Sequence, residues 1–302
     1  VQVRDLAIQE RAGDLVVGTF GRGIYVLDDL SPLRQARAAD LEREAILFAP
    51  RPAPAYVEQL HLGYRDKGFQ GDGLYAAPNP PYGALFTLYL KDEIHPAKKA
   101  RQTAESAAEK GGKVPPYPSP EVLRAEAEAE APALLLTIAD EAGRVVRRLT
   151  AAPKAGLQRV AWDLRWPPAD PASLTPAVRT NAYTSIPTGP LAAPGRYTVS
   201  LEVRAGGESR PVAGPLPFEV VAVGARALPA ADRAALEDFV GETAALQRAA
   251  LGTSRLLADT ARRAELLARA LDDAGQRAAA LRAELAALRA ELRPLSRALD
   301  GD

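Results

Sequence analysis

The sequence contains no cysteine and no methionine, and only two of its 302 residues are histidines. Without cysteine, the chain has no disulfide, no thiolate nucleophile and no cysteine-ligated metal. His61 and His95 are far apart in the sequence, so neither a catalytic triad nor a histidine metal site is expected. No cofactor is therefore predicted. The chain opens on a strand-like run without Met, and we expect its natural N-terminus to lie further upstream.

Charge of one sign is not in excess either, because Lys+Arg and Asp+Glu number 38 each. Proteins that bind nucleic acid normally carry a basic excess, so no nucleic-acid partner is expected. No apolar run approaches the roughly 18 residues of a membrane-spanning helix, so no membrane span is expected. A hydrophobic fraction of 47% and a charged fraction of 25% are typical of folded proteins. The length suffices for about two domains.

Three short β-rich runs open the chain and are joined by turns that contain glycine. The runs cover Val3 to Gln9, Leu15 to Thr19 and Ile24 to Leu27. Glycine supplies the positive φ that tight turns between antiparallel strands require. Three strands cannot bury both faces of their sheet alone, so they must pack on another element. We predict that residues 1–30 are the last blade of a β-propeller and pack on a neighbouring blade.

The next segments alternate between strand and helix patterns. Residues 31–82 are rich in proline and are predicted to form a linker and covering segment, with strand candidates at Ala45 to Phe48 and Ala55 to Gln59. Residues 83–222 have strand periodicity, interrupted by charged, alanine-rich stretches at Lys98 to Lys110 and Ser119 to Glu130. We therefore expect a helical insertion over residues 92–131, between two strands of one sheet.

Strand periodicity of two returns at Ala133. Leu134 to Ile138, a turn and Val145 to Leu149 predict a β-hairpin. Further strands are predicted at Arg159 to Leu164, Gly195 to Arg204 and Leu216 to Val221, around a proline-rich loop from Pro167 to Pro194. Six or seven such strands, with Trp162 and Tyr197 available for the core, favour an immunoglobulin-like or fibronectin-like β-sandwich.

Five segments follow one another along residues 1–222: GDLVVGTFGRGIYVLDDLSPLR, NPPYGALFTLYL, LTIADEAGRVVRRL, GLQRVAWDLRWP and GPLAAPGRYTVSLEV. In this order they resemble the C-terminal region of the bacterial sortilin-type, BNR-repeat β-propeller family, often described as glycosyl-hydrolase-like. The resemblance implies a closing blade and an immunoglobulin-like sandwich in a secreted, periplasmic or cell-envelope protein. The Ser-x-Asp-x-Gly-x-x-Trp repeat of the family is absent, and the catalytic acids of xyloglucanase-like relatives lie in other blades.

Residues 226–302 are predicted to form a helical tail. Gly252 and Gly275 are its weakest positions, so two or three antiparallel helices are expected, and Pro294 should kink the last one. A coiled-coil seam in steps of four and three is formed by Leu281, Leu285, Leu288, Leu292, Leu295 and Leu299. We favour pairing of this seam with the upstream helix, which gives a helical hairpin or bundle. The alternative is pairing with a partner chain, which gives a helix-mediated oligomer.

Two motifs in the first segment suggest chemistry. The glycine-rich GTFGRG at Gly18 to Gly23 resembles a phosphate-binding turn, but a strand follows it and not a helix, so we interpret it as a structural hairpin with Arg22 as a ligand contact on its rim. Asp28 and Asp29 resemble the paired carboxylates of a glycosidase. Adjacent strand residues point to opposite faces, so a capping or turn role is favoured and no catalytic residue is predicted.

Aromatic residues are a second source of candidate sites. A sugar-stacking platform is conceivable from Tyr75, Tyr82, Tyr89, Trp162, Trp166 and Tyr183. Trp162 shares a strand face with Val160 and Leu164 and is predicted to be in the core, whereas Trp166 at the strand end is the candidate ligand contact. A calcium site near Asp66 and Asp72 lacks the spacing of a known loop, so no metal site is predicted. The charge runs of the insertion are interpreted as solvated helix faces.

These observations favour a non-catalytic C-terminal module of a larger propeller protein, with a structural and interaction role. Its partners would be the upstream blades of the same protein and a carbohydrate or protein ligand. Two alternatives stay open. The chain is an accessory part of a glycoside hydrolase whose active site lies in the propeller, or it belongs to a sortilin-like peptide-binding receptor.

Overall fold

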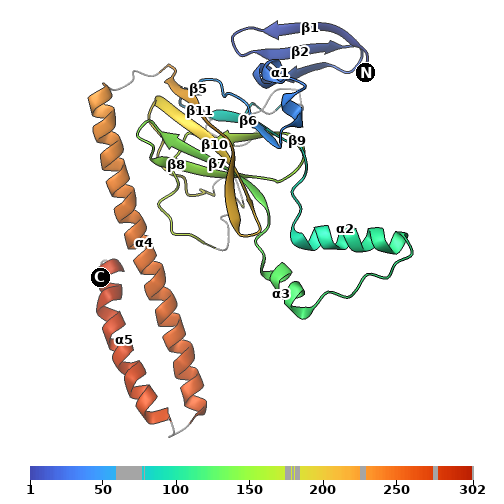
Figure 1. Ribbon diagram of the computed structural model, residues 1–302. Helices are drawn as coiled ribbons and strands as arrows, with labels where there is room; N and C mark the ends of the chain where they lie inside the picture. Colours follow the sequence, from blue (N-terminus) through green and yellow to red (C-terminus); the bar gives the residue numbers. More distant parts are fainter. Residues whose placement is uncertain are drawn as a thin grey trace. The chain divides into compact units, whose positions relative to one another are not determined.

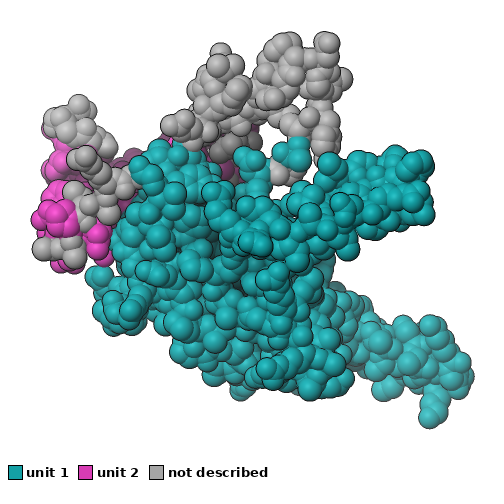
Figure 2. All heavy atoms as spheres, turned by 90° about the horizontal axis from the view of Figure 1, so that it is seen from above, with its two compact units in different colours: residues 1–166, 191–227 teal, residues 167–190, 228–302 magenta. Residues whose placement is uncertain are grey.

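The computed structural model describes residues 1–58, 77, 79–173, 178, 180, 184–224, 229–274 and 278–300. The fold is mixed α/β, about 37% helical and 30% strand, with several sheets and a helical C-terminal region. The chain divides into two compact units, residues 1–166 with 191–227 and residues 167–190 with 228–302 (Figure 2). Among the described residues, no helix is both long and apolar enough to cross a membrane.

The first three strands form an antiparallel sheet of their own in the first unit (Figure 1). They are β1 (Val3–Gln9), β2 (Asp14–Thr19) and β3 (Ile24–Leu27), in the spatial order β1-β2-β3. These bounds agree with the predicted runs, because the strand-forming residues alternate with glycine-containing turns. No residue of this sheet is fully buried.

Two further sheets build the core of the first unit. One has five strands in the order β5-β11-β10-β7-β8, and the other has three in the order β4-β6-β9. The strand bounds are β4 Ala45–Leu47, β5 Ala53–Ala55, β6 Ala84–Leu90, β7 Ala133–Asp140, β8 Val145–Ala151, β9 Gly156–Trp162, β10 Gly195–Ala205 and β11 Glu208–Ala222. All neighbouring strands are antiparallel except β5 and β11, which are parallel.

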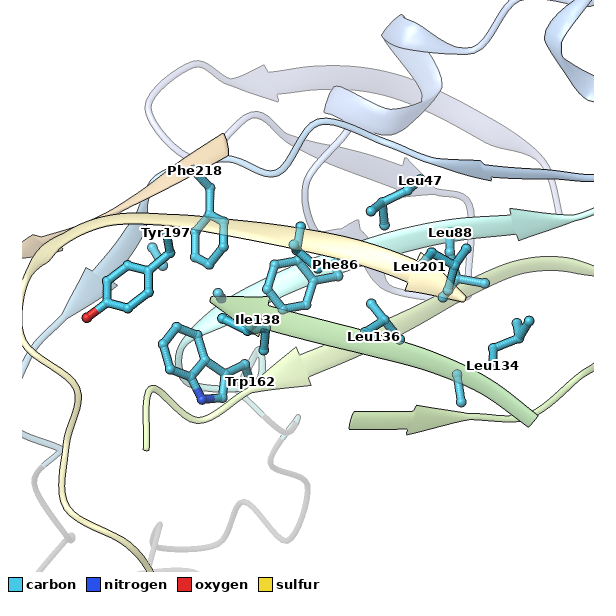
Figure 3. Close-up of a cluster of buried hydrophobic side chains, with 14 of the residues drawn as sticks. Leu47, Phe86, Leu88, Leu134, Leu136, Ile138, Trp162, Tyr197, Leu201 and Phe218 are labelled. Carbon is cyan, nitrogen blue, oxygen red and sulfur yellow. The ribbon is translucent and has the colours of Figure 1, made fainter. Parts of the chain in front are cut away.

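Side chains from both sheets form one continuous apolar core. Along β10, buried Tyr197, Val199 and Leu201 alternate with polar residues, which is the pattern of a strand covered on one face. On β6, Phe86 and Leu88 are completely buried. Figure 3 shows Phe86 of one sheet among Leu136, Ile138 and Leu201 of the other, and the ring of Phe86 packs edge-on against that of Phe218 at 5.3 Å.

The proline-rich segment after β3 contributes to these sheets. It contains helix α1 (Ser31–Gln35) and the 3₁₀ turn η1 (Asp40–Glu42), and then β4 and β5 pair at the edges of the two sheets. The strand candidate at Ala45 to Phe48 is correct to within one residue. The candidate at Ala55 to Gln59 is misplaced, because the strand ends at Ala55 and Val57 is exposed. Gln59 lies outside the described residues.

The helical insertion consists of α2 (Ala97–Lys110) and α3 (Pro120–Glu128). It follows β6 and precedes β7 in the chain, and these two strands belong to different sheets. The prediction that the insertion joins two strands of one sheet is therefore wrong. The alternating pattern of a strand does not specify its partner. In the structure β6 pairs with β9, which follows the insertion and the β7–β8 hairpin in the chain.

The second unit contains two helices, α4 (Ala230–Asp273) and α5 (Ala279–Asp300). Helix α4 continues through Gly252, because the alanine, leucine and arginine around it are strong helix formers. Helix α5 continues through Pro294. Arg282 donates to the carbonyl oxygen of Leu271 at 2.6 Å, and Arg289 to that of Ala264 at 3.3 Å, so α5 lies antiparallel to the C-terminal half of α4. Gly275 lies outside the described residues.

Candidate functional site

Arg22 lies in the tight turn between β2 and β3. Gly21 and Gly23 on either side of it have positive φ angles of 72° and 81°, which only glycine adopts without strain. The backbone amide and the hydroxyl of Thr19 both donate to the carbonyl oxygen of Gly23, at 3.2 and 2.6 Å. The glycine-rich motif is thus a closed hairpin turn, as predicted. Arg22 is exposed at its tip.

Asp29 is the most highly connected carboxylate of the first segment. Its Oδ1 accepts hydrogen bonds from the backbone amide and the hydroxyl of Ser31, at 3.0 and 2.6 Å, at the start of α1. Its own amide donates to Oδ1 of Asp14 at 2.9 Å. These bonds hold Asp29 at a φ of 50°, which the short polar side chain of aspartate tolerates. The predicted turn role is confirmed for Asp29, whereas the N-cap residue of α1 is Leu30.

Two arginines connect Asp29 to the remainder of the first unit. Arg159 of β9 donates to the carbonyl oxygen of Asp29 at 2.9 Å, over a separation of 130 residues. Arg51, just before β5, lies 3.6 Å from the Asp29 carboxylate and donates to the carbonyl oxygen of Arg11 at 2.9 Å. We call Asp29, Arg51 and Arg159 the junction residues. Sequence reasoning missed both arginines, because nothing in the local pattern indicates a partner so distant in the chain.

Trp162 and Trp166 differ as expected in their exposure. Trp162 has no exposed surface, donates from its indole nitrogen to the carbonyl oxygen of Arg165 at 2.9 Å, and packs edge-on against Tyr197 at 5.4 Å (Figure 3). The prediction that it belongs to the core is confirmed. Trp166 is half-buried against the same core, and its carbonyl oxygen accepts a hydrogen bond from Arg147 at 3.2 Å.

The aromatic platform is not assembled from the residues that the structure describes. Tyr75 and Tyr183 lie outside them, and Trp162 is in the core. Tyr82 instead pairs edge-on with Tyr56, with ring centroids 5.0 Å apart. Partial burial raises the pKa of Tyr82 above its ordinary value. The Tyr56–Tyr82 pair was not foreseen, because Tyr56 was assigned to a strand candidate.

The remaining candidates do not form a site. The structure does not describe His61, Asp66 or Asp72. Among the residues that it does describe, no group of three or more His, Cys, Asp or Glu side chains could hold a metal ion. His95 is half-exposed, and its Nδ1 lies 3.1 Å from a Glu93 carboxylate oxygen. The charge runs of the insertion are not purely solvated, as described next.

Arg101 of α2 joins the two helices of the insertion. Its Nε and Nη2 each donate to a Glu126 oxygen of α3 at 2.7 Å, and its Nη1 donates to Glu105 at 2.7 Å. These bonds hold the pKa of Glu126 below its ordinary value, because a carboxylate that accepts two charged hydrogen bonds resists protonation. The prediction of solvated helix faces is wrong for Arg101 and Glu126, which bind α2 to α3.

A shallow pocket opens beside the five-stranded sheet. Its volume is about 320 Å³, and it is lined by Pro50, Pro52, Arg196, Pro217, Phe218 and Glu219. No candidate site residue from the sequence lies in it.

The β1–β3 sheet carries a group of exposed apolar side chains. Strand register places Leu6, Val17 and Tyr25 in one cross-strand row, and Ala7, Val16 and Val26 in the next. Successive rows point to opposite faces, so each face of this sheet carries apolar side chains, while Asp5, Gln9 and Asp14 share the face of Ala7. Ile24 is 73% exposed, Leu6 59%, Val26 56% and Tyr25 52%. Among the described residues, no side chain of this sheet is fully buried on either face.

No protein-family model matches the sequence, and no curated protein gives a significant match to it. Nothing beyond the segments themselves therefore supports the propeller resemblance.

Proposed function

We propose that this chain is a non-catalytic C-terminal module of a larger bacterial β-propeller protein of the sortilin-type, BNR-repeat kind, secreted or located in the cell envelope. In this proposal, β1–β3 belong to the last propeller blade. The two-sheet core is an immunoglobulin-like β-sandwich that braces the blade, and α4 and α5 form a helical tail for interaction. The observation that carries the proposal is a sheet with exposed apolar side chains on both faces.

A sheet at the surface of a protein usually has one apolar and one polar face, because one side meets water. The β1–β3 sheet instead has exposed apolar side chains on both faces, and exposed apolar patches mark interaction surfaces. Propeller blades meet this description, because each blade packs between two neighbours. Blades have four strands, so the three strands β1–β3 also leave a place for one strand from another segment.

The junction residues support the bracing role. Arg159 belongs to the three-stranded sheet of the core, and Arg51 precedes β5 of the other sheet. Both hold Asp29, directly after β3, where the chain leaves the β1–β3 sheet. The hydrogen bond from Arg159 to the carbonyl oxygen of Asp29 is directional, and the ion pair of Arg51 with the Asp29 carboxylate adds to it. The β1–β3 sheet is thus attached to the core through Asp29, directly after β3. The two faces of the sheet are not used in this attachment.

The proposal is tested by comparing one substitution in two contexts. Ile24→Thr changes a side chain that is 73% exposed, so in the 302-residue chain it should alter the free energy of unfolding by less than about 0.5 kcal/mol. In the longer natural polypeptide, where a neighbouring blade covers Ile24, the same change should cost about 1 to 2 kcal/mol. Val114→Thr, in an exposed loop, is the matched control and should be neutral in both. Equal effects of Ile24→Thr in both contexts would contradict the proposal.

A further inference from the structure

The paired helices of the second unit carry an apolar surface that their own contact does not cover. The buried contact between them includes Ala264 of α4, together with Ala278 and Leu285, which lie before and in α5. Of the six leucines of the predicted seam, only Leu285 is buried. We define the leucine flank as five exposed residues: Leu256 and Leu267 of α4, and Leu281, Leu288 and Leu295 of α5.

Helix geometry places the leucines of α5 on one side of the contact. With about 100° of rotation per residue, Leu281 and Leu288 lie on one side of Leu285. Arg282 and Arg289 lie on the other side, where they donate to carbonyl oxygens of α4. Leu281, Leu288 and Leu295 are spaced by seven residues, which is the repeat of a coiled-coil stripe.

Helix α4 has the same division. Leu267 and Asp272 lie on opposite sides of the buried Ala264. Asp272 lies 3.7 Å from Arg282, so it marks the polar side of the helix pair. Leu267 is therefore on the opposite side, together with Leu288 of α5. The helix pair thus has a polar flank and a leucine flank, and single exposed leucines scattered over a surface would not have this arrangement.

The charges at the two edges of the leucine flank are of opposite sign. Arg263 is at the α4 edge, and its side chain is 76% exposed while its Nε lies 2.8 Å from Asp259. Glu284 and Glu291 are exposed at the α5 edge. Arg289 of α5 donates to the carbonyl oxygen of Ala264 of α4, so these two residues are level along the helix axes. Their neighbours Arg263 and Glu291 are therefore nearly level as well.

We propose that the leucine flank binds the same flank of a second copy of this chain. A two-fold axis parallel to the helices places α4 of one copy over α5 of the other, with Arg263 of each copy facing Glu291 of its partner copy. The alternative, α4 over α4, brings Arg263 against Arg263 and is disfavoured by like charge. The result is a four-helix bundle in which both stripes of leucines are covered. This inference does not depend on the proposed function.

The first experiment measures the mass of the 302-residue chain by sedimentation equilibrium from 5 to 200 µM. The wild type should approach twice 32.0 kDa as concentration rises. Leu267→Lys should weaken association at least tenfold, because it places a charge in the covered flank. Leu266→Lys is the matched control, since Leu266 is 59% exposed and Leu267 56%, but Leu266 points away from the flank.

Circular dichroism at 222 nm shows whether each variant keeps its helices. A wild type that stays at 32.0 kDa at 200 µM overturns the proposal. Equal weakening by Leu266→Lys and Leu267→Lys, with helix content retained, also overturns it.

A charge exchange tests the arrangement of the two copies independently of the leucines. Arg263→Glu and Glu291→Arg should each weaken self-association, because each places like charges together twice per dimer. A mixture of the two variants should form a heterodimer, because both contacts are then between opposite charges. Association of the mixture no stronger than that of either variant alone overturns the α4-over-α5 arrangement.

Discussion

Gly83 is the position at which the pairing of β6 with β9 is most sensitive to a single atom. Its φ is +104°, and a Cβ added to it would lie 1.9 Å from the carbonyl oxygen of Trp162 and 2.9 Å from the carbonyl carbon. A carbon and an oxygen that are not bonded normally stay more than about 3.2 Å apart. Gly83→Ala therefore requires β6 and β9 to separate by more than about 1 Å where their pairing begins.

Three costs add at this position. A non-glycine residue at this φ costs about 1 to 2 kcal/mol. Separating the strands weakens a ladder hydrogen bond, worth about 1 kcal/mol. It also loosens the packing around Trp162 and Ala84, both essentially unexposed, for about 1 kcal/mol more. Gly83→Ala should thus lower the free energy of unfolding by about 3 to 4 kcal/mol, which is large for one methyl group.

Gly143 provides the matched control. It also has a positive φ, +79°, but an added Cβ would meet no atom within 4 Å. Gly143→Ala should cost only about 1 kcal/mol, from the backbone conformation alone. Urea unfolding followed by tryptophan fluorescence reports on the first unit, which contains both tryptophans. If the two variants differ by less than about 1 kcal/mol, the close approach of β6 to the Trp162 carbonyl does not limit stability and the reasoning is refuted.

Three further predictions concern polar groups. Thr87 is buried with no hydrogen-bond partner for its hydroxyl among the described residues, so Thr87→Val should raise the free energy of unfolding by about 1 kcal/mol in the same urea assay; a loss of stability would contradict this. Asp29→Ala should cost about 1 to 2 kcal/mol and Asp28→Ala less than about 0.5, since Asp29 is the residue whose carboxylate accepts the amide and hydroxyl of Ser31; equal costs would be incompatible with the junction. Because the pKa of Glu126 is lowered, its contribution to the α2–α3 contact is complete above its ordinary pKa of 4.5 and disappears as pH falls through the lowered value. A carbon-13 NMR titration of Glu126 should give a midpoint below 4.5 that rises in Arg101→Ala, and an unchanged midpoint would exclude the pairing.

Local features were predictable from the sequence, and distant pairings were not. The runs of β1–β3 and the β7–β8 hairpin follow from alternation and turn residues close in the chain. The same alternation does not specify that β9 pairs with β6 or that β5 lies parallel to β11. A period of two determines which side chains share a face of the sheet, but it does not determine which strand is the neighbour.

The site residues show the same limit. The turn role of Asp29 follows from its position after a strand, whereas its contact with Arg159 joins residues 130 apart. The leucine seam was recognised from its spacing. Which of its leucines face α4 depends on the register of two antiparallel helices, and the arginine contacts of α5 determine that register.

Amide hydrogen exchange of β1–β3 most directly tests whether this sheet is a propeller blade. In the 302-residue chain its amides should exchange much faster than those of β10, because both faces of the sheet are exposed. In the longer polypeptide that the proposed function requires, β1–β3 should become at least about tenfold better protected while β10 stays unchanged. Exchange of β1–β3 at the same rate in both would show that no neighbouring blade covers them, and would contradict the proposed function.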